Sequence, residues 1–175
     1  MPHSMPPPFA SFLRAHFNAH RRRNGPAFFW RVSLEWFVAS TAPLLLIATF
    51  HDFTPRRDLE ELSPALLFIV ACIGAPLVET LFQSLPVMVA RRFRAGFWTQ
   101  VFVAIVPFAA MHFRISVVSG ICAGIVGGFY LAFFYAHWRE TSLGRAYWMT
   151  CAAHAFSNFV IVAVVLLAKG LEGTA

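Results

Sequence analysis

Long apolar stretches separated by short polar ones make up most of the chain. A membrane-crossing helix needs about 20 mainly apolar residues, and several stretches approach or exceed that length. They are residues 27–50, 65–90, 96–112, 115–137 and 146–168. The pattern predicts an all-α, polytopic transmembrane helical bundle of about five or six spans.

Prolines inside the second and third stretches affect how regular these helices are. Pro76, Pro86 and Pro107 lack a backbone N–H, and such residues kink membrane helices. We therefore expect broken helices in this part of the chain, with short re-entrant pieces as an alternative.

Composition supports a membrane protein and limits the number of domains. Of the 175 residues, 58 % are hydrophobic and 13 % are charged, which is outside the usual range of soluble proteins. We expect residues 1–26 to form a basic, Pro-rich N-terminal surface segment and residues 27–170 to form a single membrane domain. Residues 9–20 fit either an amphipathic helix on the membrane surface or a disordered tail.

The net charge of +6 does not indicate nucleic acid as a partner, because the basic residues lie in small clusters beside apolar stretches. Membrane lipids and topology explain these clusters better. With five spans, residues 21–23, 91–94 and 139–145 fall on one side, which the positive-inside rule assigns to the cytoplasm. We expect a multi-pass protein of a bacterial inner membrane with a cytoplasmic N-terminus. Arg31 and Glu35, four residues apart in the first span, are expected to pair with each other.

Small residues recur in the fourth stretch. Gly120, Gly124 and Gly128 are spaced by four residues and line up on one helix face, where another helix can approach closely. This helix–helix contact belongs either to packing within the bundle or to a dimer. Cys72, Cys122 and Cys151 lie in apolar stretches without CxxC spacing and are interpreted as buried thiols.

Four strongly polar side chains interrupt three of the apolar stretches: Glu79, His112, His154 and Asn158. A His or Asn of this kind can serve as a hydrogen-bonding contact between helices. A carboxylate inside the membrane is a functional hypothesis by default. Residues four apart share a helix face, so Glu79 with Gln83 and His154 with Asn158 can point at a common interior site.

Two kinds of chemistry could use this set. A Glu and two His can bind a divalent metal, but there is no HExxH and the three ligands lie on three helices, so we predict no cofactor and leave a divalent metal as the open alternative. In the other scheme, Glu79 acts as general base on a water that His112 helps to orient or deprotonate. His154 and Asn158 then stabilise the oxyanion that forms on an attacked carbonyl. That scheme is peptide-bond hydrolysis in a membrane cavity.

The same residues resemble motifs of the CPBP family, the CAAX-type prenyl endopeptidases and bacteriocin-processing proteins also called Abi proteins. The family carries EExxxR, FxxxH and HxxxN or HxxxD on successive transmembrane helices. "FAAMH" supplies Phe108 and His112, "HAFSN" supplies His154 and Asn158, and the resemblance spans residues 70–165. It implies a helical membrane bundle that cleaves peptides or membrane proteins, with Glu79, His112, His154 and Asn158 as catalytic residues and Phe108 in support.

The first motif departs from the family pattern. In "VETLFQS", Thr80 stands at the second glutamate if Glu79 is the first, or Gln83 stands at the arginine if Glu79 is the second. In both registers the paired carboxylate and the arginine are missing, and Thr80 and Gln83 are the supporting polar groups. The alternative is therefore a catalytically inactive CPBP-like protein that binds a membrane partner or acts as an assembly subunit.

Overall fold

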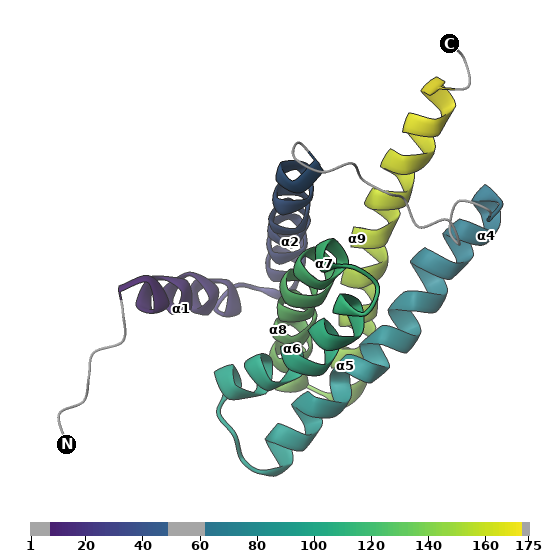
Figure 1. Cartoon of the computed structure of the whole chain (residues 1–175). Coiled ribbons are helices and arrows are strands. Elements are labelled where there is room, and N and C mark those ends of the chain that lie inside the picture. Colours follow the sequence, from purple (N-terminus) through teal and green to yellow (C-terminus); the bar gives the residue numbers. More distant parts are fainter. Residues whose placement is uncertain (1–7, 49–61, 173–175) are drawn as a thin grey trace.

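The computed structural model describes residues 8–48 and 62–172, which form helices and no strands (Figure 1). The predicted all-helical bundle is confirmed. The elements in chain order are α1 (Pro8–Arg21), α2 (Gly25–Ala48), α4 (Pro64–Ile69), η1 (Val70–Gly74), α5 (Ala75–Arg92), α6 (Phe97–Phe113), α7 (Val117–Ser119), η2 (Gly120–Gly127), α8 (Gly128–Arg139) and α9 (Leu143–Glu172). The stretches η1 and η2 are π-helical.

Three helices of the described chain are long and apolar enough to cross a membrane. They are Pro64–Arg92, Val117–Arg139 and Leu143–Val164, and each coincides with a stretch that the sequence marks as a span. The helix α6 is apolar but shorter, with 17 residues. The prediction of a membrane protein with transmembrane helices is thus supported by length and composition.

Side-chain caps explain where several helices begin. A Ser or Asn before a helix accepts a hydrogen bond from a backbone N–H of the first turn, which otherwise has no partner. The capping bonds are Leu66 N to Ser63 Oγ, 3.3 Å; Ser119 N to Ser116 Oγ, 3.0 Å; Arg145 N to Ser142 Oγ, 3.1 Å; and Ala27 N to Asn24 Oδ1, 3.0 Å. The connections between α6 and α7 and between α8 and α9 are short, with three residues each.

The predicted helix breaks do not occur. Pro64–Arg92 is one continuous helical segment that contains Pro76 and Pro86, and α6 continues through Pro107. Of these prolines, Pro76 lies next to an irregularity, because η1 ends at Gly74 and Pro76 is the second residue of α5. Because α5 continues from η1, the N–H missing at Pro76 removes one backbone hydrogen bond, yet the helical segment continues through it.

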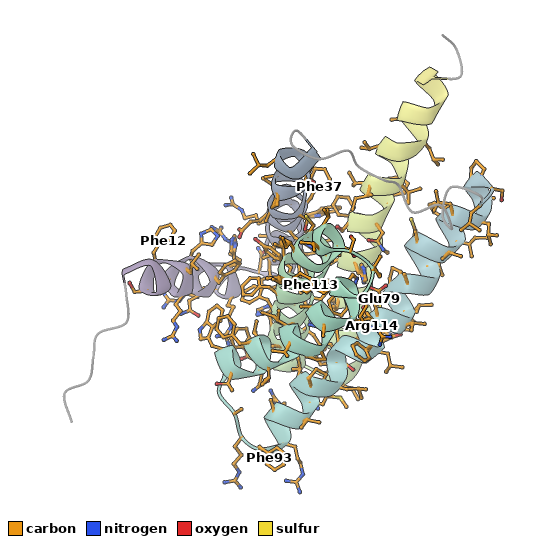
Figure 2. The ribbon with its side chains drawn as sticks, viewed as in Figure 1. Phe12, Phe37, Glu79, Phe93, Phe113 and Arg114 are labelled. Atoms are coloured by element: carbon orange, nitrogen blue, oxygen red, sulfur yellow. The ribbon has the colours of Figure 1, made fainter. Side chains whose placement is uncertain are left out.

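The centre of the bundle is α8. Every residue from Tyr130 to Ala136 is buried, and the core around them includes Phe28 of α2 and Phe108 of α6. A second buried cluster consists of Leu67, Cys72 and Val162, and many other apolar residues, such as Val78 on α5, are exposed on the outer faces of the long helices. Figure 2 shows Phe12 and Phe93 pointing away from the bundle, whereas Glu79 turns from α5 towards the neighbouring helices.

The N-terminal helix α1 lies across the bundle rather than along it (Figure 1). Its Phe17 is 5 % exposed and packs edge-on against Phe129 and Phe133 of α8. Of the two alternatives for residues 9–20, the helix is therefore the one observed. The predicted pair between Arg31 and Glu35 is wrong, because Glu35 bonds to side chains of α1 and α8 instead.

Basic residues gather at one end of the bundle. The guanidinium carbon of Arg21 lies 3.7 Å from the centre of the Phe97 ring, and Arg21 forms an ion pair with Glu140. These contacts bring together the end of α1, the start of α6 and the end of α8. The basic clusters of residues 21–23, 91–94 and 139–145 therefore share one end.

The glycines of the fourth stretch face α6 of the same chain. A Cβ on Gly124 would lie 2.8 Å from the Cα of Ala109 and 3.0 Å from the Cβ of His112, and one on Gly128 would lie 3.0 Å from Phe108 Cδ1. Because these glycines lack side chains, the backbones of η2 and α6 approach closely. Packing within the bundle accounts for this face, and it fixes the position of His112.

Candidate functional site

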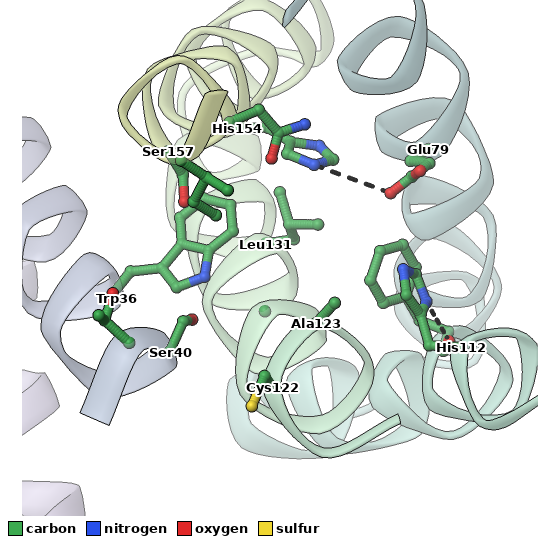
Figure 3. Close-up of a pocket in the computed structure, with 14 residues that line it drawn as sticks. Trp36, Ser40, Glu79, His112, Cys122, Ala123, Leu131, His154 and Ser157 are labelled. Carbon is green, nitrogen blue, oxygen red and sulfur yellow. Dashed lines mark hydrogen bonds and ion pairs between the residues drawn. The ribbon is translucent and has the colours of Figure 1, made fainter. Parts of the chain in front are cut away.

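The four polar residues that the sequence places in three separate spans meet in one cavity (Figure 3). The cavity has a volume of about 200 Å³ and lies between α2, α5, α6, η2 and α9. Glu79, His112, His154 and Asn158 all line it, together with Phe108. Residues 79, 112 and 154 are far apart in the chain, so the bundle fold itself assembles the site.

Glu79 and His154 face each other across the cavity. The Nε2 atom of His154 lies 3.7 Å from Oε2 of Glu79, and their side chains are 7 % and 27 % exposed. This separation exceeds a hydrogen bond but is close for an acid and a base in a poorly solvated place. The pair therefore joins a proton acceptor to a group that can donate a hydrogen bond.

His112 lines the cavity from α6, and one of its ring nitrogens is hydrogen-bonded within its own helix. Its Nδ1 lies 2.9 Å from the carbonyl oxygen of Phe108, one turn earlier on the same helix. A carbonyl oxygen can only accept, so Nδ1 carries the hydrogen and Nε2 of the neutral ring keeps a free lone pair. His112 is thus positioned as a hydrogen-bond acceptor or base.

Asn158 is held by a backbone irregularity of the neighbouring helix. Its Nδ2 donates a 2.7 Å hydrogen bond to the carbonyl oxygen of Ala71 in η1. The N–H of Ala75 bonds to Val70, five residues earlier, in the π-helical manner. The next donor in that pattern would be residue 76, which is a proline without an N–H. The Ala71 carbonyl therefore lacks its backbone donor, and the side-chain amide of Asn158 donates to it instead.

Two further bonds connect α9 to the same segment. The hydroxyl of Tyr147 donates to the carbonyl of Leu77 at 2.9 Å, and the thiol of Cys151 donates to that of Pro76 at 3.5 Å. Together with the bond of Asn158, they connect α9 to the segment from Ala71 to Leu77 at three positions along its length. His154 lies between the levels of Cys151 and Asn158, so its position opposite Glu79 is fixed.

Thr80 and Gln83 lie outside the cavity wall. Both side chains are fully buried, and Nε2 of Gln83 donates a 2.9 Å hydrogen bond to the carbonyl oxygen of Gly128. The expectation that Glu79 and Gln83 share one site is therefore not met. Although they lie four residues apart, Glu79 faces the cavity and Gln83 faces the start of α8.

Several cavity residues have no place in the sequence-based set. Trp36 and Ser40 of α2 close the side opposite Glu79, and Ser157 of α9 lies near them (Figure 3). The ring centre of Trp36 is 5.8 Å from that of His154. The signal that could have revealed this wall is the pair of hydroxyl residues Ser40 and Thr41 inside an otherwise apolar stretch.

The cavity residues do not form a compact metal-ligand set. Among the residues that the structure describes, one group brings three potential ligand atoms within 4.8 Å of one another, and it consists of His16, His20 and Glu35. Glu79, His112 and His154 are not such a group. The carboxylate of Glu79 and the imidazoles of His112 and His154 are side chains that can accept or donate protons.

No protein-family model, curated protein sequence or solved structure matches the chain.

Proposed function

We propose that this protein is a CPBP-like intramembrane endopeptidase that hydrolyses a peptide bond with a water activated by Glu79. The observation that carries the proposal is the meeting of Glu79, His112, His154 and Asn158 in one cavity of a bundle with membrane-length helices. Their order and spacing along the chain resemble the CPBP motifs. The substrate class is a peptide or a membrane protein that reaches the cavity, and membrane lipids surround the bundle.

In the proposed reaction, the carboxylate of Glu79 takes a proton from a water as its oxygen attacks the carbonyl carbon of the scissile bond. The free Nε2 of His112 accepts the second hydrogen of that water and so orients it. The new C–O bond leaves negative charge on the carbonyl oxygen, and the Nε2–H of His154 donates to it. Asn158 contributes its remaining amide hydrogen, since the other is bonded to Ala71. The C–N bond then breaks, and Glu79 returns its proton to the leaving amine.

The surroundings of the pair suit such a reaction. His154 is nearly buried, and Glu79 is one-quarter exposed on the cavity side. Charges that develop in such a poorly hydrated place interact strongly with fixed donors. The family's second glutamate and arginine are missing from this chain, and here His154 faces Glu79 at 3.7 Å.

The proposed location is a bacterial inner membrane, with the basic end of the bundle and the N-terminus in the cytoplasm. The clustering of residues 21–23, 91–94 and 139–145 at one end supports this orientation, because basic loops are retained on the cytoplasmic side.

The decisive experiment is a cleavage assay with the purified full chain in proteoliposomes. The probes are a farnesylated CAAX peptide, a leader-type peptide and a synthetic transmembrane segment, and the products are identified by mass spectrometry. Glu79→Gln should reduce the rate of any specific cleavage by about 10²- to 10⁴-fold, because a general base contributes on that scale.

Glu140→Gln is the matched control. It makes the same chemical change at an exposed carboxylate that pairs with Arg21 at the end of the bundle. Cleavage should therefore survive in Glu140→Gln. Equal rates in wild type and Glu79→Gln would remove Glu79 from the reaction, and a loss in both variants would indicate a general folding defect.

A second candidate is the inactive, partner-binding protein. Two observations favour it: one amide hydrogen of Asn158 is already bonded to Ala71, and Gln83, at the family's arginine position in one register, bonds to Gly128 and not to Glu79. Photo-crosslinking from Ser40, on the opposite wall, would capture a partner peptide. For a binding protein, the crosslink and its yield should be the same in wild type and Glu79→Gln, without any cleaved product.

A further inference from the structure

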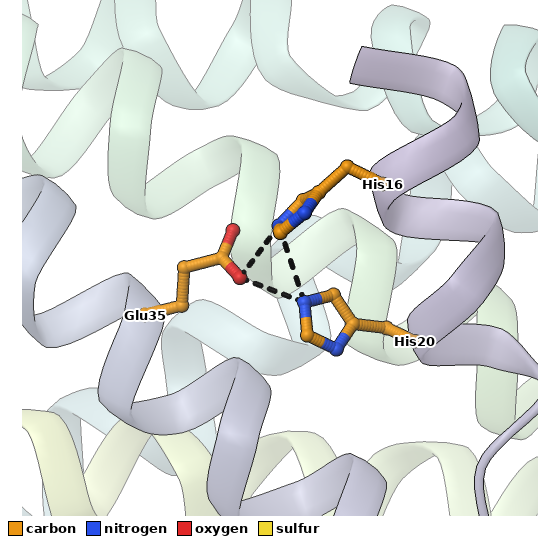
Figure 4. Close-up of side chains that lie close together, drawn as sticks. All are labelled: His16, His20 and Glu35. Carbon is orange, nitrogen blue, oxygen red and sulfur yellow. Dashed lines mark hydrogen bonds and ion pairs between the residues drawn. The ribbon is translucent and has the colours of Figure 1, made fainter. Parts of the chain in front are cut away.

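A second group of titratable side chains lies where α1 meets α2, away from the cavity (Figure 4). His16 and His20 come from α1 and Glu35 comes from α2. Their ligand atoms converge: Nε2 of His16 lies 2.9 Å and Nε2 of His20 lies 2.7 Å from the same oxygen, Oε2 of Glu35. The two Nε2 atoms are 3.2 Å apart.

This convergence is built by the fold. His16 and His20 are four residues apart, so they share one face of α1. Phe17, between them, inserts among the rings of α8 and fixes how α1 is turned. That orientation directs both imidazoles towards Glu35, whose predicted partner Arg31 is not involved.

We propose that His16, His20 and Glu35 bind a divalent transition-metal ion of the Zn²⁺ class. Two imidazole nitrogens and one carboxylate oxygen are a common ligand set for Zn²⁺, with a fourth position taken by water. The pair of histidines four residues apart on one helix supplies two adjacent ligands. The chain positions all three without a rearrangement of its helices.

The distances suit a small cation after a minor adjustment. In a tetrahedral zinc site, with metal–ligand bonds of about 2.0–2.1 Å, neighbouring ligand atoms are about 3.3 Å apart. The three separations here are 2.7, 2.9 and 3.2 Å. The largest change, about 0.6 Å from 2.7 to about 3.3 Å, is between His20 and Glu35 and is within the reach of side-chain rotation, because the side chain of Glu35 is 28 % exposed.

Tyr130 holds the carboxylate in the orientation that a metal needs. Its hydroxyl donates a 2.8 Å hydrogen bond to Oε1 of Glu35, the oxygen that the histidines do not contact. Oε2 is thereby left as the ligand. Hydrogen bonds of this kind to the ligands of a metal typically change its affinity by about 10- to 100-fold.

The bound metal would clamp the N-terminal helix to the bundle. Two ligands belong to α1 and one to α2, so the ion links the two helices. His20 is nearly buried while His16 borders solvent, and the open side can admit a metal and a water. This inference is independent of the proposed peptidase, because the three ligands do not line the cavity.

The test is a titration of the metal-stripped full chain with Zn²⁺, purified in detergent through a tag that contains no histidine. Isothermal titration calorimetry should give one Zn²⁺ per chain at micromolar or tighter affinity. Co²⁺ in place of Zn²⁺ should give the intense visible absorption of a four-coordinate site. Binding that is absent at these concentrations, or Co²⁺ absorption of the weak six-coordinate type, would overturn the proposal.

Variants identify the ligands. His16→Gln, His20→Gln and Glu35→Gln should each weaken Zn²⁺ binding by about 100-fold or more, and Tyr130→Phe should weaken it by about 10- to 100-fold. His16→Gln is the most secure of these variants, since His16 is the most exposed ligand. The matched control, His112→Gln, changes a cavity histidine and should leave Zn²⁺ binding intact.

Loss of Zn²⁺ binding in His112→Gln but not in His16→Gln would place the metal in the cavity and contradict the proposal. Equal binding in all the variants would mean adventitious surface binding and would contradict it as well. Cleavage activity is not a readout of this titration, so a failure here leaves the peptidase proposal untouched.

Discussion

The side-chain amide of Asn158 donates a 2.7 Å hydrogen bond to the backbone carbonyl of Ala71, at a π-helical stretch that ends just before Pro76. The carbonyl that accepts this bond lies five residues before Pro76, so the asparagine of α9 and the proline of the neighbouring helix act at the same backbone position. The proline removes a backbone donor, and the asparagine replaces it. This bond also sets the position of α9 against the helix that carries Glu79.

The first prediction follows from that exchange. Asn158→Ala should lower the free energy of unfolding by about 0.6–1.7 kcal/mol, between the average and the largest value measured for hydrogen bonds between membrane helices. Pro76→Ala supplies an N–H to the same carbonyl, so Asn158→Ala should cost less in the Pro76→Ala background. A double-mutant cycle, measured by reversible unfolding in detergent, checks this. Strictly additive effects would show that Pro76 is not the reason why the carbonyl of Ala71 needs the side chain of Asn158 as its donor.

The second prediction concerns the close approach of η2 and α6. Gly124→Ala should destabilise the protein by about 1–3 kcal/mol, because the new methyl group would lie 2.8 Å from backbone at Ala109 and must push α6 away. Gly144→Ala is the matched control, since a Cβ there meets nothing within 4 Å and alanine favours a helix. Thermal unfolding of both variants should show a loss for Gly124→Ala alone.

The third prediction separates catalysis from stability at His112. His112→Gln should lower the rate of peptide cleavage by about 10²- to 10⁴-fold, because the free Nε2 is lost. The melting temperature should change little, since the described hydrogen bond of His112 is to its own helix. Cleavage and thermal unfolding are measured on the same preparation. A variant that unfolds but retains cleavage per folded molecule would remove His112 from the mechanism.

The fourth prediction tests how α1 is attached. Phe17→Ala removes the ring that α1 inserts into the core and should weaken the docking of α1 by about 3 kcal/mol. Limited proteolysis and hydrogen exchange should then detect opening of Pro8–Arg21. Phe12→Ala, at a residue that is 66 % exposed, should leave both measurements unchanged. Equal protection of α1 in the two variants would contradict the role of Phe17.

The fifth prediction concerns orientation in the membrane. In a background without the three buried cysteines, Thr141→Cys reports the basic end and Arg114→Cys reports the end of α6 away from it. A membrane-impermeant maleimide should label Arg114→Cys in intact spheroplasts and Thr141→Cys only after lysis. The opposite pattern would reverse the assignment of the N-terminus to the cytoplasm.

The positions of the helices were predictable because they depend on local chemistry. The expected stretches 65–90 and 115–137 correspond to the helical segments Pro64–Arg92 and Val117–Arg139. Long apolar runs mark such segments, and backbone hydrogen bonds within a helix need no distant partner. The spacing of His154 and Asn158 likewise placed both on the wall of one cavity.

Partners across helices were predicted less well. Spacing by four residues states that two side chains share a helix face, but it does not state what that face meets. Gln83 therefore turned out to bond to Gly128 while Glu79 faces His154. Glu35 likewise bonds to histidines 15 and 19 residues earlier and not to Arg31, four residues away.

The sequence by itself determined an all-helical bundle with membrane-length apolar helices, and it identified the polar residues that could not face lipid. The tertiary structure alone decided that Glu79 meets His154, that Asn158 meets the carbonyl freed beside Pro76, and that His16, His20 and Glu35 converge. The physical reason is that burial of apolar surface depends mainly on composition along the chain. Hydrogen bonds and ion pairs require particular atoms within about 3–4 Å, and only the packing of the helices sets those distances.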